Sequence, residues 1–168
     1  MDNYLDSTSP EYVRRMASAL NAKWEALAPY VTSGARVLDY GCGMPVEGGI
    51  RERVEAAGGV YECHDISATV ETAMRDAGAT FRTKEDLQER EGSYDVVFLS
   101  SVVHELTGQD DGFEELEAIW GLSLTVVWLS FAIGRESGSR RAQSCRSHLR
   151  SSRRMLCVKS SLGLVRSH

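Results

Sequence analysis

The chain has 168 residues, of which 42% are hydrophobic and 26% charged, and its formal net charge is −5. This composition is typical of a soluble globular protein with one core, and the length leaves little room for a second core. The longest apolar run, residues 122–133, is about half as long as a membrane-spanning helix. The acidic N-terminus lacks a signal-peptide hydrophobic stretch. Four cysteines without a Cys-x-x-Cys spacing indicate free thiols in a reducing compartment, so a cytoplasmic location is expected.

The first predicted element is an amphipathic helix near the N-terminus. Ser9, Pro10 and Glu11 read as an N-cap, a first-turn proline and an early carboxylate. An apolar stripe follows, and we favour the interpretation that it packs against the core. The alternative is that Tyr12 or Trp24 of this stripe forms a lid over a ligand. The stripe has spacings of four, four, four and three residues: Tyr12, Met16, Leu20, Trp24 and Leu27.

A buried strand and a glycine turn come next. Residues 36–40 predict the strand, which places the carboxylate of Asp39 near its end. Gly41 and Gly43 permit positive φ angles in the turn, and a helix is expected from about Val46. Such a close backbone approach at the carboxyl end of a strand is typical of nucleotide-binding α/β proteins.

A second strand, residues 60–64, ends at Asp65, which lies 24 residues after Gly41. In dinucleotide-binding folds an acid at about this distance accepts hydrogen bonds from the ribose hydroxyls. Ile66 is then expected to pack on the adenine. The alternative is that Asp65 only caps a helix that begins near Ser67.

The remaining predicted elements follow in regular order. Residues 79–82 predict a short strand, and residues 83–87 a polar loop. The near-continuous apolar run at residues 94–100 is typical of a central parallel strand that is buried on both faces. A fifth strand is expected within residues 122–133, after a helix with the apolar residues Phe113, Leu116, Ile119 and Trp120.

Two of these stretches resemble a known family. Residues 37–43, Val-Leu-Asp-Tyr-Gly-Cys-Gly, resemble the first signature of class I S-adenosylmethionine-dependent methyltransferases, and residues 94–106 resemble that family's fourth strand and loop. The resemblance covers about residues 4–133. It implies an α/β, three-layer Rossmann-like fold with a mostly parallel twisted sheet and helices on both faces. Pro45 departs from the family's glycine pattern, and the C-terminal strands are expected to be missing or irregular, since the family's antiparallel edge pair is not found.

The resemblance also implies a site and its cofactor, S-adenosylmethionine. The resemblance implies that Glu85 or Asp86 lies near the adenine amino group of the cofactor. The alternative is that both acids belong to a solvated loop without a ligand. The best candidate for a base that deprotonates the acceptor is His104, because a free imidazole titrates near neutral pH. Glu105 orients it or replaces it, and a helix cap is the alternative role for His104. The other expected cofactor-binding residues are Asp39, Gly41, Cys42, Gly43, Asp65, Ile66, Ser100 and Ser101.

No metal site is expected. Cys63, His64 and Asp65 are consecutive, and adjacent strand residues point to opposite faces, so the three side chains do not converge. Cys42 is interpreted as a small space-filling residue rather than a nucleophile.

The charge reverses along the chain. Residues 1–117 hold 23 acidic and 10 basic side chains, a net charge of −13, whereas residues 118–168 hold 1 acidic and 9 basic side chains, a net charge of +8. We therefore expect a cofactor-binding domain over residues 1–133, with a helical lid over residues 1–34, and a poorly ordered basic tail over residues 134–168. An altered reading frame after about Trp120 is the alternative, which translation of the other two frames tests.

Together these features predict a methyltransferase that acts on a small molecule. Methyl transfer from a sulfonium requires alignment and exclusion of water rather than a protein nucleophile. The basic tail leaves a nucleic-acid acceptor open, and no membrane partner is expected. A non-catalytic remnant that binds S-adenosylmethionine or another nucleotide without turnover is the main alternative. A nicotinamide-dependent oxidoreductase is a third interpretation, which the short glycine pattern disfavours.

Overall fold

The computed structural model describes residues 10, 19–100, 112–123, 125–131 and 154–160, and a parallel sheet lies at its centre. Its six strands lie in the order β3-β2-β1-β4-β5-β6, and every neighbouring pair is parallel. This is the strand order of doubly wound nucleotide-binding folds. The strands are β1 Arg36–Tyr40, β2 Val60–His64, β3 Thr80–Phe81, β4 Val96–Ser100, β5 Thr125–Phe131 and β6 Arg154–Ser160.

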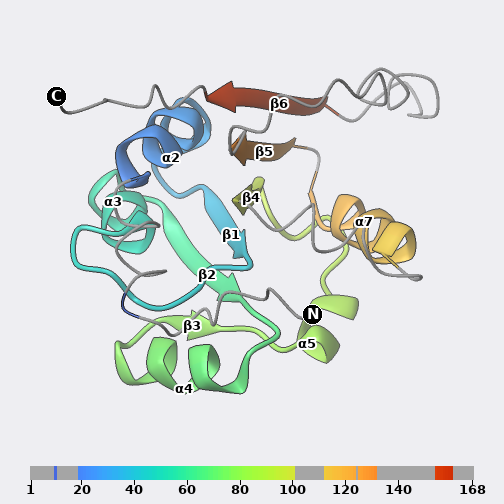
Figure 1. Ribbon diagram of the computed structural model, residues 1–168. Coiled ribbons are helices and arrows are strands. Elements are labelled where there is room, and N and C mark those ends of the chain that lie inside the picture. The colour runs from blue at the N-terminus through green and yellow to red at the C-terminus, as the bar shows by residue number, and fades with distance from the viewer. Residues whose placement is uncertain (1–9, 11–18, 101–111, 124, 132–153, 161–168) are drawn as a thin grey trace, which may run out of the picture.

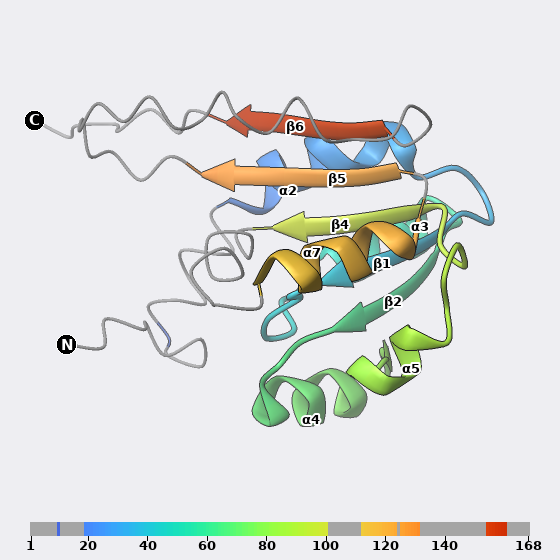
Figure 2. The same cartoon turned by 90° about the vertical axis from the view of Figure 1, so that its right-hand side faces the viewer.

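Helices cover both faces of the sheet, which gives the predicted three layers (Figure 1). On one face lie α2 (Leu20–Leu27), α3 (Ile50–Ala56) and α4 (Ala68–Asp76). A short 3-10 helix, η1 (Ala28–Tyr30), continues α2. On the other face lie α5 (Lys84–Gln88) and α7 (Gly112–Gly121). The view in Figure 2 shows α7 in front of the sheet, with its axis roughly along the direction of the strands.

The two cores follow the alternation of side chains along each strand. Val37 and Phe98 belong to the core beneath α2, α3 and α4, whereas Leu38 and Leu99 belong to the core beneath α5 and α7. All five residues of β4 are buried, which confirms the prediction of a central strand. Leu27 is fully buried and Trp24 packs against the first core, in agreement with the favoured interpretation of the apolar stripe.

Two predicted elements differ from the structure. α3 begins at Ile50 rather than near Val46, because Gly48 has a φ of 66°, which a right-handed helix does not accommodate. Residues 83–87 are not a loop, since they form most of α5. Thr83 and Asp86 stabilise the start of that helix through a reciprocal capping box.

Among the residues that the structure describes after β5, one segment, residues 154–160, forms a strand. β6 pairs with β5 along its whole length, from Thr125 opposite Arg154 to Phe131 opposite Ser160. The pairing is parallel, and no antiparallel pair occurs among the described residues. Apart from residues 154–160, the predicted tail lies outside the described residues. So do Ser9, Glu11, Tyr12 and Met16, whereas Pro10 is helical.

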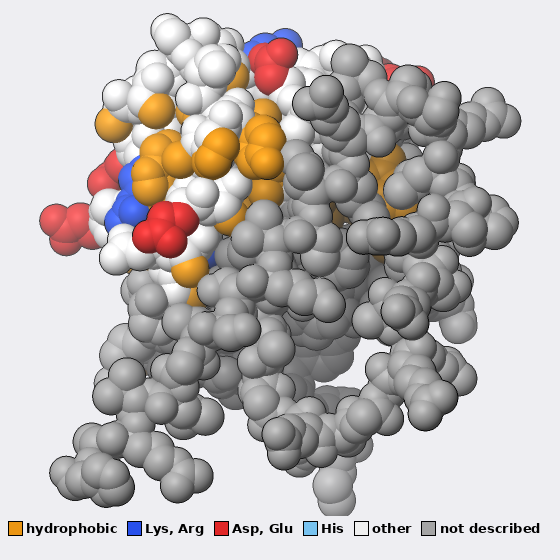
Figure 3. Space-filling view, turned by 90° about the horizontal axis from the view of Figure 1, so that it is seen from above, with side chains coloured by type: hydrophobic (Ala, Val, Ile, Leu, Met, Phe, Trp, Pro, Cys, Tyr) orange, Lys and Arg blue, Asp and Glu red, His pale blue; other side chains and the backbone are white. Residues whose placement is uncertain are grey.

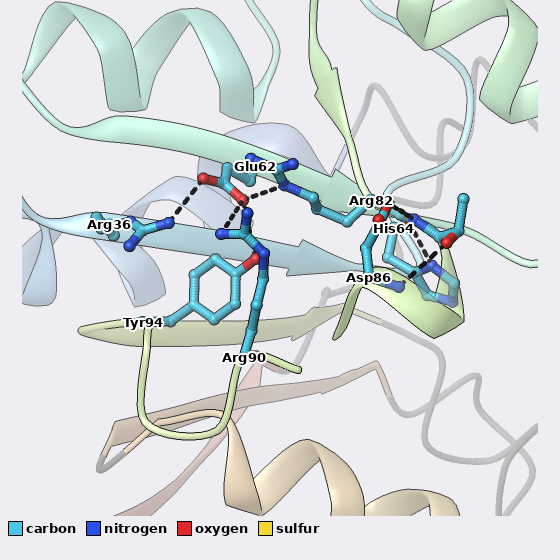
Figure 4. Close-up of polar contacts among 8 residues, drawn as sticks. Arg36, Glu62, His64, Arg82, Asp86, Arg90 and Tyr94 are labelled. Carbon is cyan, nitrogen blue, oxygen red and sulfur yellow. Dashed lines mark hydrogen bonds and ion pairs between the residues drawn. The ribbon is translucent and has the colours of Figure 1, made fainter. Parts of the chain in front are cut away.

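A buried carboxylate stabilises the sheet on the α5 side (Figure 4). Glu62 on β2 is 4% exposed, and its Oε1 accepts a hydrogen bond from Arg36 at 3.0 Å. Its Oε2 accepts hydrogen bonds from Arg82 at 2.6 Å and from Tyr94 at 2.9 Å, and it lies 3.7 Å from Nη1 of Arg90. Burial favours the neutral acid, but these donors outweigh it and lower the pKa of Glu62 to about 2.

The described surface carries charges of both signs. In the face that Figure 3 presents, hydrophobic side chains gather in a patch, and Lys, Arg, Asp and Glu side chains lie beside it. Within the described part of the chain, no helix has the length and apolarity needed to cross a bilayer.

Candidate functional site

A cavity of about 260 Å³ lies at the carboxyl ends of β1 and β4. The strand order reverses between these two neighbours, and ligands of doubly wound sheets bind at such a position. Leu20 and Lys23 of α2 form one wall, and Phe98 and Ser100 of β4 form another. Asp39 and the segment that leads into α3 complete the cavity.

Strand register brings the polar groups of the cavity together. Asp39 pairs with Phe98 of β4, and Ser100 follows two residues later, so its side chain points to the same face of the sheet as that of Phe98. Asp39 and Ser100 therefore both line the cavity, whereas Asp65, the third strand-end residue expected at the site, is not among the residues that line it.

The glycine turn after β1 adopts the predicted backbone conformation. Gly41 and Gly43 have φ angles of 78° and 67°. The N–H groups of Gly41 and Cys42 donate to the carbonyl of His64 at 2.8 and 3.1 Å, and the N–H of Gly43 donates to Oδ2 of Asp65 at 3.0 Å. These bonds hold the turn against the end of β2. A Cβ atom on Gly43 would meet no atom within 4 Å, so the space beside this glycine is open.

Asp39 is a buried carboxylate with one neutral donor. It is 4% exposed, and its Oδ2 accepts a hydrogen bond of 3.1 Å from the hydroxyl of Tyr61. Burial raises the pKa of Asp39 to about 6, although the attraction of Lys23 and the Tyr61 bond oppose this shift. Asp39 therefore retains free acceptor positions beside the cavity.

Lys23 is a functional candidate that our reasoning from the sequence missed. Its side chain is almost fully buried, and burial lowers its pKa to about 8, while the attraction of Asp39 partly restores it. The signal was the position of a lysine on the apolar stripe, three residues after Leu20 and four before Leu27. A lysine on the buried face of a helix needs a partner for its charge.

Ser100 presents a hydroxyl without a hydrogen-bond partner among the described residues. The residue is 5% exposed and lines the cavity. Buried polar groups nearly always have a partner, so the Ser100 hydroxyl is available to a ligand that enters the cavity.

Neither Asp65 nor Ile66 is among the residues that line the cavity, but Asp65 connects the glycine turn, which does line it, to α4. Its Oδ1 accepts a hydrogen bond from the N–H of Ser67 at 3.0 Å, and its Oδ2 accepts the bond from Gly43. Two lone pairs of the carboxylate remain for a ligand. The N-cap of α4 is Ser67, whose Oγ accepts from Val70, so Asp65 is not the cap itself. Ile66 is 85% exposed and offers apolar surface next to this carboxylate.

The other predicted site residues do not line the cavity or lie outside the described residues. Glu85 and Asp86 are exposed on α5, and Asp86 is engaged with Thr83 in the capping box. Neither belongs to the cavity wall. The residues that lie outside the described part are Ser101, His104 and Glu105.

Two cysteines lie near the glycine turn, Cys42 and Cys63. Hydrogen bonding with Cys63, together with burial, raises the pKa of the Cys42 thiol, which makes a nucleophilic role unfavourable. Cys63 packs in the core beneath α2, whereas His64 contacts Tyr40 on the opposite side of the sheet, with ring centroids 4.7 Å apart. Within the described residues, no group of three His, Cys, Asp or Glu side chains is arranged to hold a metal ion.

A second cavity, of about 320 Å³, lies between α5 and α7. Its polar groups pair with one another, since the hydroxyl of Tyr40 and the ammonium of Lys84 both donate to the carboxylate of Glu115. None of the described residues predicted to bind a cofactor lines this cavity, so it is not the candidate site.

Comparison with known proteins finds no matching family model and no matching curated protein. Solved structures similar to this chain include S-adenosylmethionine-dependent methyltransferases. The magnesium protoporphyrin IX methyltransferase from Synechocystis PCC 6803, crystallised with bound S-adenosylmethionine, has a TM-score of 0.46 and 20% identity over 73% of this chain and 61% of that chain. A methyltransferase from Aquifex aeolicus has a TM-score of 0.47 and 16% identity over 68% of this chain and 67% of that chain.

A third similar structure is a complex of the Trm112 methyltransferase activator from Haloferax volcanii. The protein that matches in this complex has a TM-score of 0.49 and 20% identity over 66% of this chain and 52% of that chain. The present chain therefore spans about half to two thirds of the length of these three proteins.

Proposed function

We propose that residues 1–133 form a methyltransferase domain that binds S-adenosylmethionine in the cavity at the ends of β1 and β4, with residues 1–34 as its lid. One observation carries the proposal. A glycine turn with two positive φ angles, a buried carboxylate and a serine hydroxyl that has no partner among the described residues share one cavity. That cavity lies at the position where doubly wound sheets bind nucleotides.

The side chains around the cavity match the parts of the cofactor. Asp65 has two free acceptor positions for a vicinal ribose diol, and the exposed side chain of Ile66 offers apolar surface to the adenine. The open space beside Gly43 lets the ligand approach the backbone. Asp39 and Ser100 supply polar groups deeper in the cavity. Gly41 and Cys42 of the turn also line the cavity.

The proposed chemistry requires little covalent participation by the chain. Bound S-adenosylmethionine supplies a methyl group on a sulfonium with a good leaving group. The chain orients the acceptor and excludes water, and His104 removes the acceptor proton, with Glu105 orienting it or acting in its place. These two residues follow Ser100, the last residue of β4, by four and five positions. Ser101, Glu85 and Asp86 remain further proposed contacts of the cofactor.

We propose a small molecule as the acceptor. The net charge of −13 on residues 1–117 opposes binding of a phosphate backbone along the body of the protein. A nucleotide-binding remnant without turnover is the alternative, since no antiparallel edge pair occurs among the described residues. A nicotinamide dinucleotide ligand is a further candidate, because the strand order also occurs in dinucleotide-binding sheets.

Titration calorimetry separates these possibilities. We expect S-adenosylmethionine and S-adenosylhomocysteine to bind with micromolar dissociation constants and NAD to give no heat of binding. Glu117→Gln, in the wall of the second cavity, serves as a control that leaves these affinities unchanged. The proposal is contradicted if NAD binds and neither S-adenosylmethionine nor S-adenosylhomocysteine binds. A methyl-release assay over a panel of small acceptors then distinguishes an active enzyme from a remnant, which binds the cofactor and releases no methyl group.

A further inference from the structure

One arginine joins two segments that line the cavity. α2 and α3 lie side by side on one face of the sheet (Figure 1), and Arg53 of α3 reaches across to α2. Its Nη2 donates a hydrogen bond of 2.9 Å to Oδ1 of Asn21. Its Nε donates a hydrogen bond of 2.8 Å to the carbonyl of Gly48. The guanidinium therefore connects α2 to the segment that leads into α3.

Both of these segments belong to the cavity wall. α2 contributes Leu20 and Lys23 to the wall, and Asn21 lies between them in the chain. Residues 44–47 and Gly49 line the cavity from the segment between the glycine turn and α3. The space available to a ligand therefore depends on how far α2 lies from residues 44–49.

The two contacts of Arg53 differ in their surroundings. Gly48 is held on both sides, because its N–H donates to Oε2 of Glu52 at 2.8 Å while its carbonyl accepts from Arg53. The turn there is tight, since a Cβ atom on Gly49 would lie 2.5 Å from a backbone oxygen. Asn21, in contrast, is exposed, and a hydrogen bond in water contributes little net free energy and can break reversibly. Arg53 is thus anchored at the Gly48 end and able to release α2 at the Asn21 end.

We propose that Arg53 is a positioning residue that holds α2 close to residues 44–49 and thereby slows the release of the bound ligand. This inference rests on the proposed function. A ligand enclosed between the two segments leaves when they move apart, and the bond to Asn21 breaks in that step because it spans them. A guanidinium suits this task, since its planar fork directs several N–H donors at acceptors from two segments at once, whereas a lysine ammonium is a point charge.

Surface plasmon resonance on the immobilised chain measures the dissociation rate constant of S-adenosylhomocysteine. Asn21→Ala removes the contact with α2 and keeps the contact with Gly48, and we expect dissociation to become about two- to fivefold faster. Asn21→Asp gives Arg53 a charged partner and should make dissociation about two- to threefold slower. We expect Arg53→Ala to release the ligand about three- to tenfold faster than the wild-type chain. Addition of Asn21→Ala to that variant should then have no further effect, because the two residues act through one bond.

The matched control is Arg75→Ala, which removes an exposed arginine that pairs with Glu71 within α4 and should leave the dissociation rate unchanged. Because Asn21 is exposed, both Asn21 variants should melt at the temperature of the wild-type chain. The role of Arg53 is overturned, and the proposed function still stands, if Asn21→Ala does not release the ligand faster than the wild-type chain. Additive effects of Asn21→Ala and Arg53→Ala overturn that role as well. Failure of the wild-type chain to bind S-adenosylhomocysteine overturns both the role of Arg53 and the proposed function.

Discussion

The backbone N–H of Gly43 donates a hydrogen bond of 3.0 Å to Oδ2 of Asp65, and this bond joins the glycine turn after β1 to the end of β2. The other oxygen of the same carboxylate accepts from the N–H of Ser67, the N-cap of α4. Asp65 therefore stabilises the turn and the start of a helix. It does so without using the two lone pairs that a ligand needs.

Replacement of Asp65 by alanine is expected to weaken the binding of S-adenosylhomocysteine by about 1–3 kcal/mol, because buried hydrogen bonds to the ligand are lost. Titration calorimetry measures this change. Asp76→Ala, at the exposed end of α4, is the control and should bind as the wild-type chain does. Unchanged affinity in Asp65→Ala would remove Asp65 from the site.

Asp39→Asn is expected to increase the stability of the unliganded protein while it weakens cofactor binding. Folding raises the pKa of Asp39 from 3.8 to about 6, so its contribution to stability is complete below about pH 4 and is lost as the pH rises through 6. Asparagine stays neutral and can keep the bond from Tyr61. We expect the variant to be about 1–3 kcal/mol more stable at pH 7.5 and similar at pH 4.

Urea unfolding at both pH values measures the effect of Asp39→Asn. The account of Asp39 is wrong if the asparagine variant is less stable than the wild-type chain at pH 7.5. It is also wrong if the stability difference does not depend on pH.

Two buried serines provide a matched pair. The hydroxyl of Ser100 has no partner among the described residues, whereas Oγ of Ser123 accepts from the N–H of Thr125 and lies 3.0 Å from the carbonyl of Asp95. We expect Ser100→Ala to raise the free energy of unfolding by up to about 1 kcal/mol and to lower the affinity for S-adenosylhomocysteine. Ser123→Ala should lower the stability by about 1–3 kcal/mol and leave the affinity unchanged. Chemical denaturation measures the change in the free energy of unfolding of both variants, and calorimetry measures the change in affinity. Equal destabilisation of the two variants would contradict the assignment of Ser100 to the ligand.

Glu62 is expected to make stability depend on acid pH. Its pKa is lowered from 4.5 to about 2 in the folded chain, so its contribution is complete above about pH 4.5 and is lost as the pH falls toward 2. Glu62→Gln leaves three arginines without their shared carboxylate and should cost about 2–4 kcal/mol at pH 7. The gap to the wild-type chain should narrow at pH 3. Urea denaturation of Glu62→Gln, of the wild-type chain and of the exposed control Glu89→Gln tests this prediction. A difference in the free energy of unfolding between Glu62→Gln and the wild-type chain that does not change with pH would refute it.

Much of the fold could be predicted because its signals are local. The apolar run of β4, the positive-φ glycines and the stripe of α2 follow from periodicity and turn chemistry. The start of α3 was predicted four residues too early, since Gly48 extends the turn. The helix α5 was missed because it is one of the shortest elements and depends on the capping box of Thr83 and Asp86. β6 was not predicted, since its pairing with β5 joins segments far apart in the sequence.

The candidate site could be predicted in part for the same reason. Asp39, Ser100 and the turn glycines lie at strand ends, and the register of a parallel sheet brings such ends together. Lys23 comes from a helix that packs over the strand ends, so its place in the cavity depends on tertiary packing. Its polar side chain on an apolar stripe was the available signal.

A crystal structure of the chain grown with S-adenosylhomocysteine tests the central claim most directly. We expect the ligand in the cavity at the ends of β1 and β4, with its ribose beside Asp65 and its thioether end toward Ser100. The account is contradicted if the ligand binds instead in the cavity between α5 and α7. It is also contradicted if ordered protein atoms fill the cavity beside Asp39.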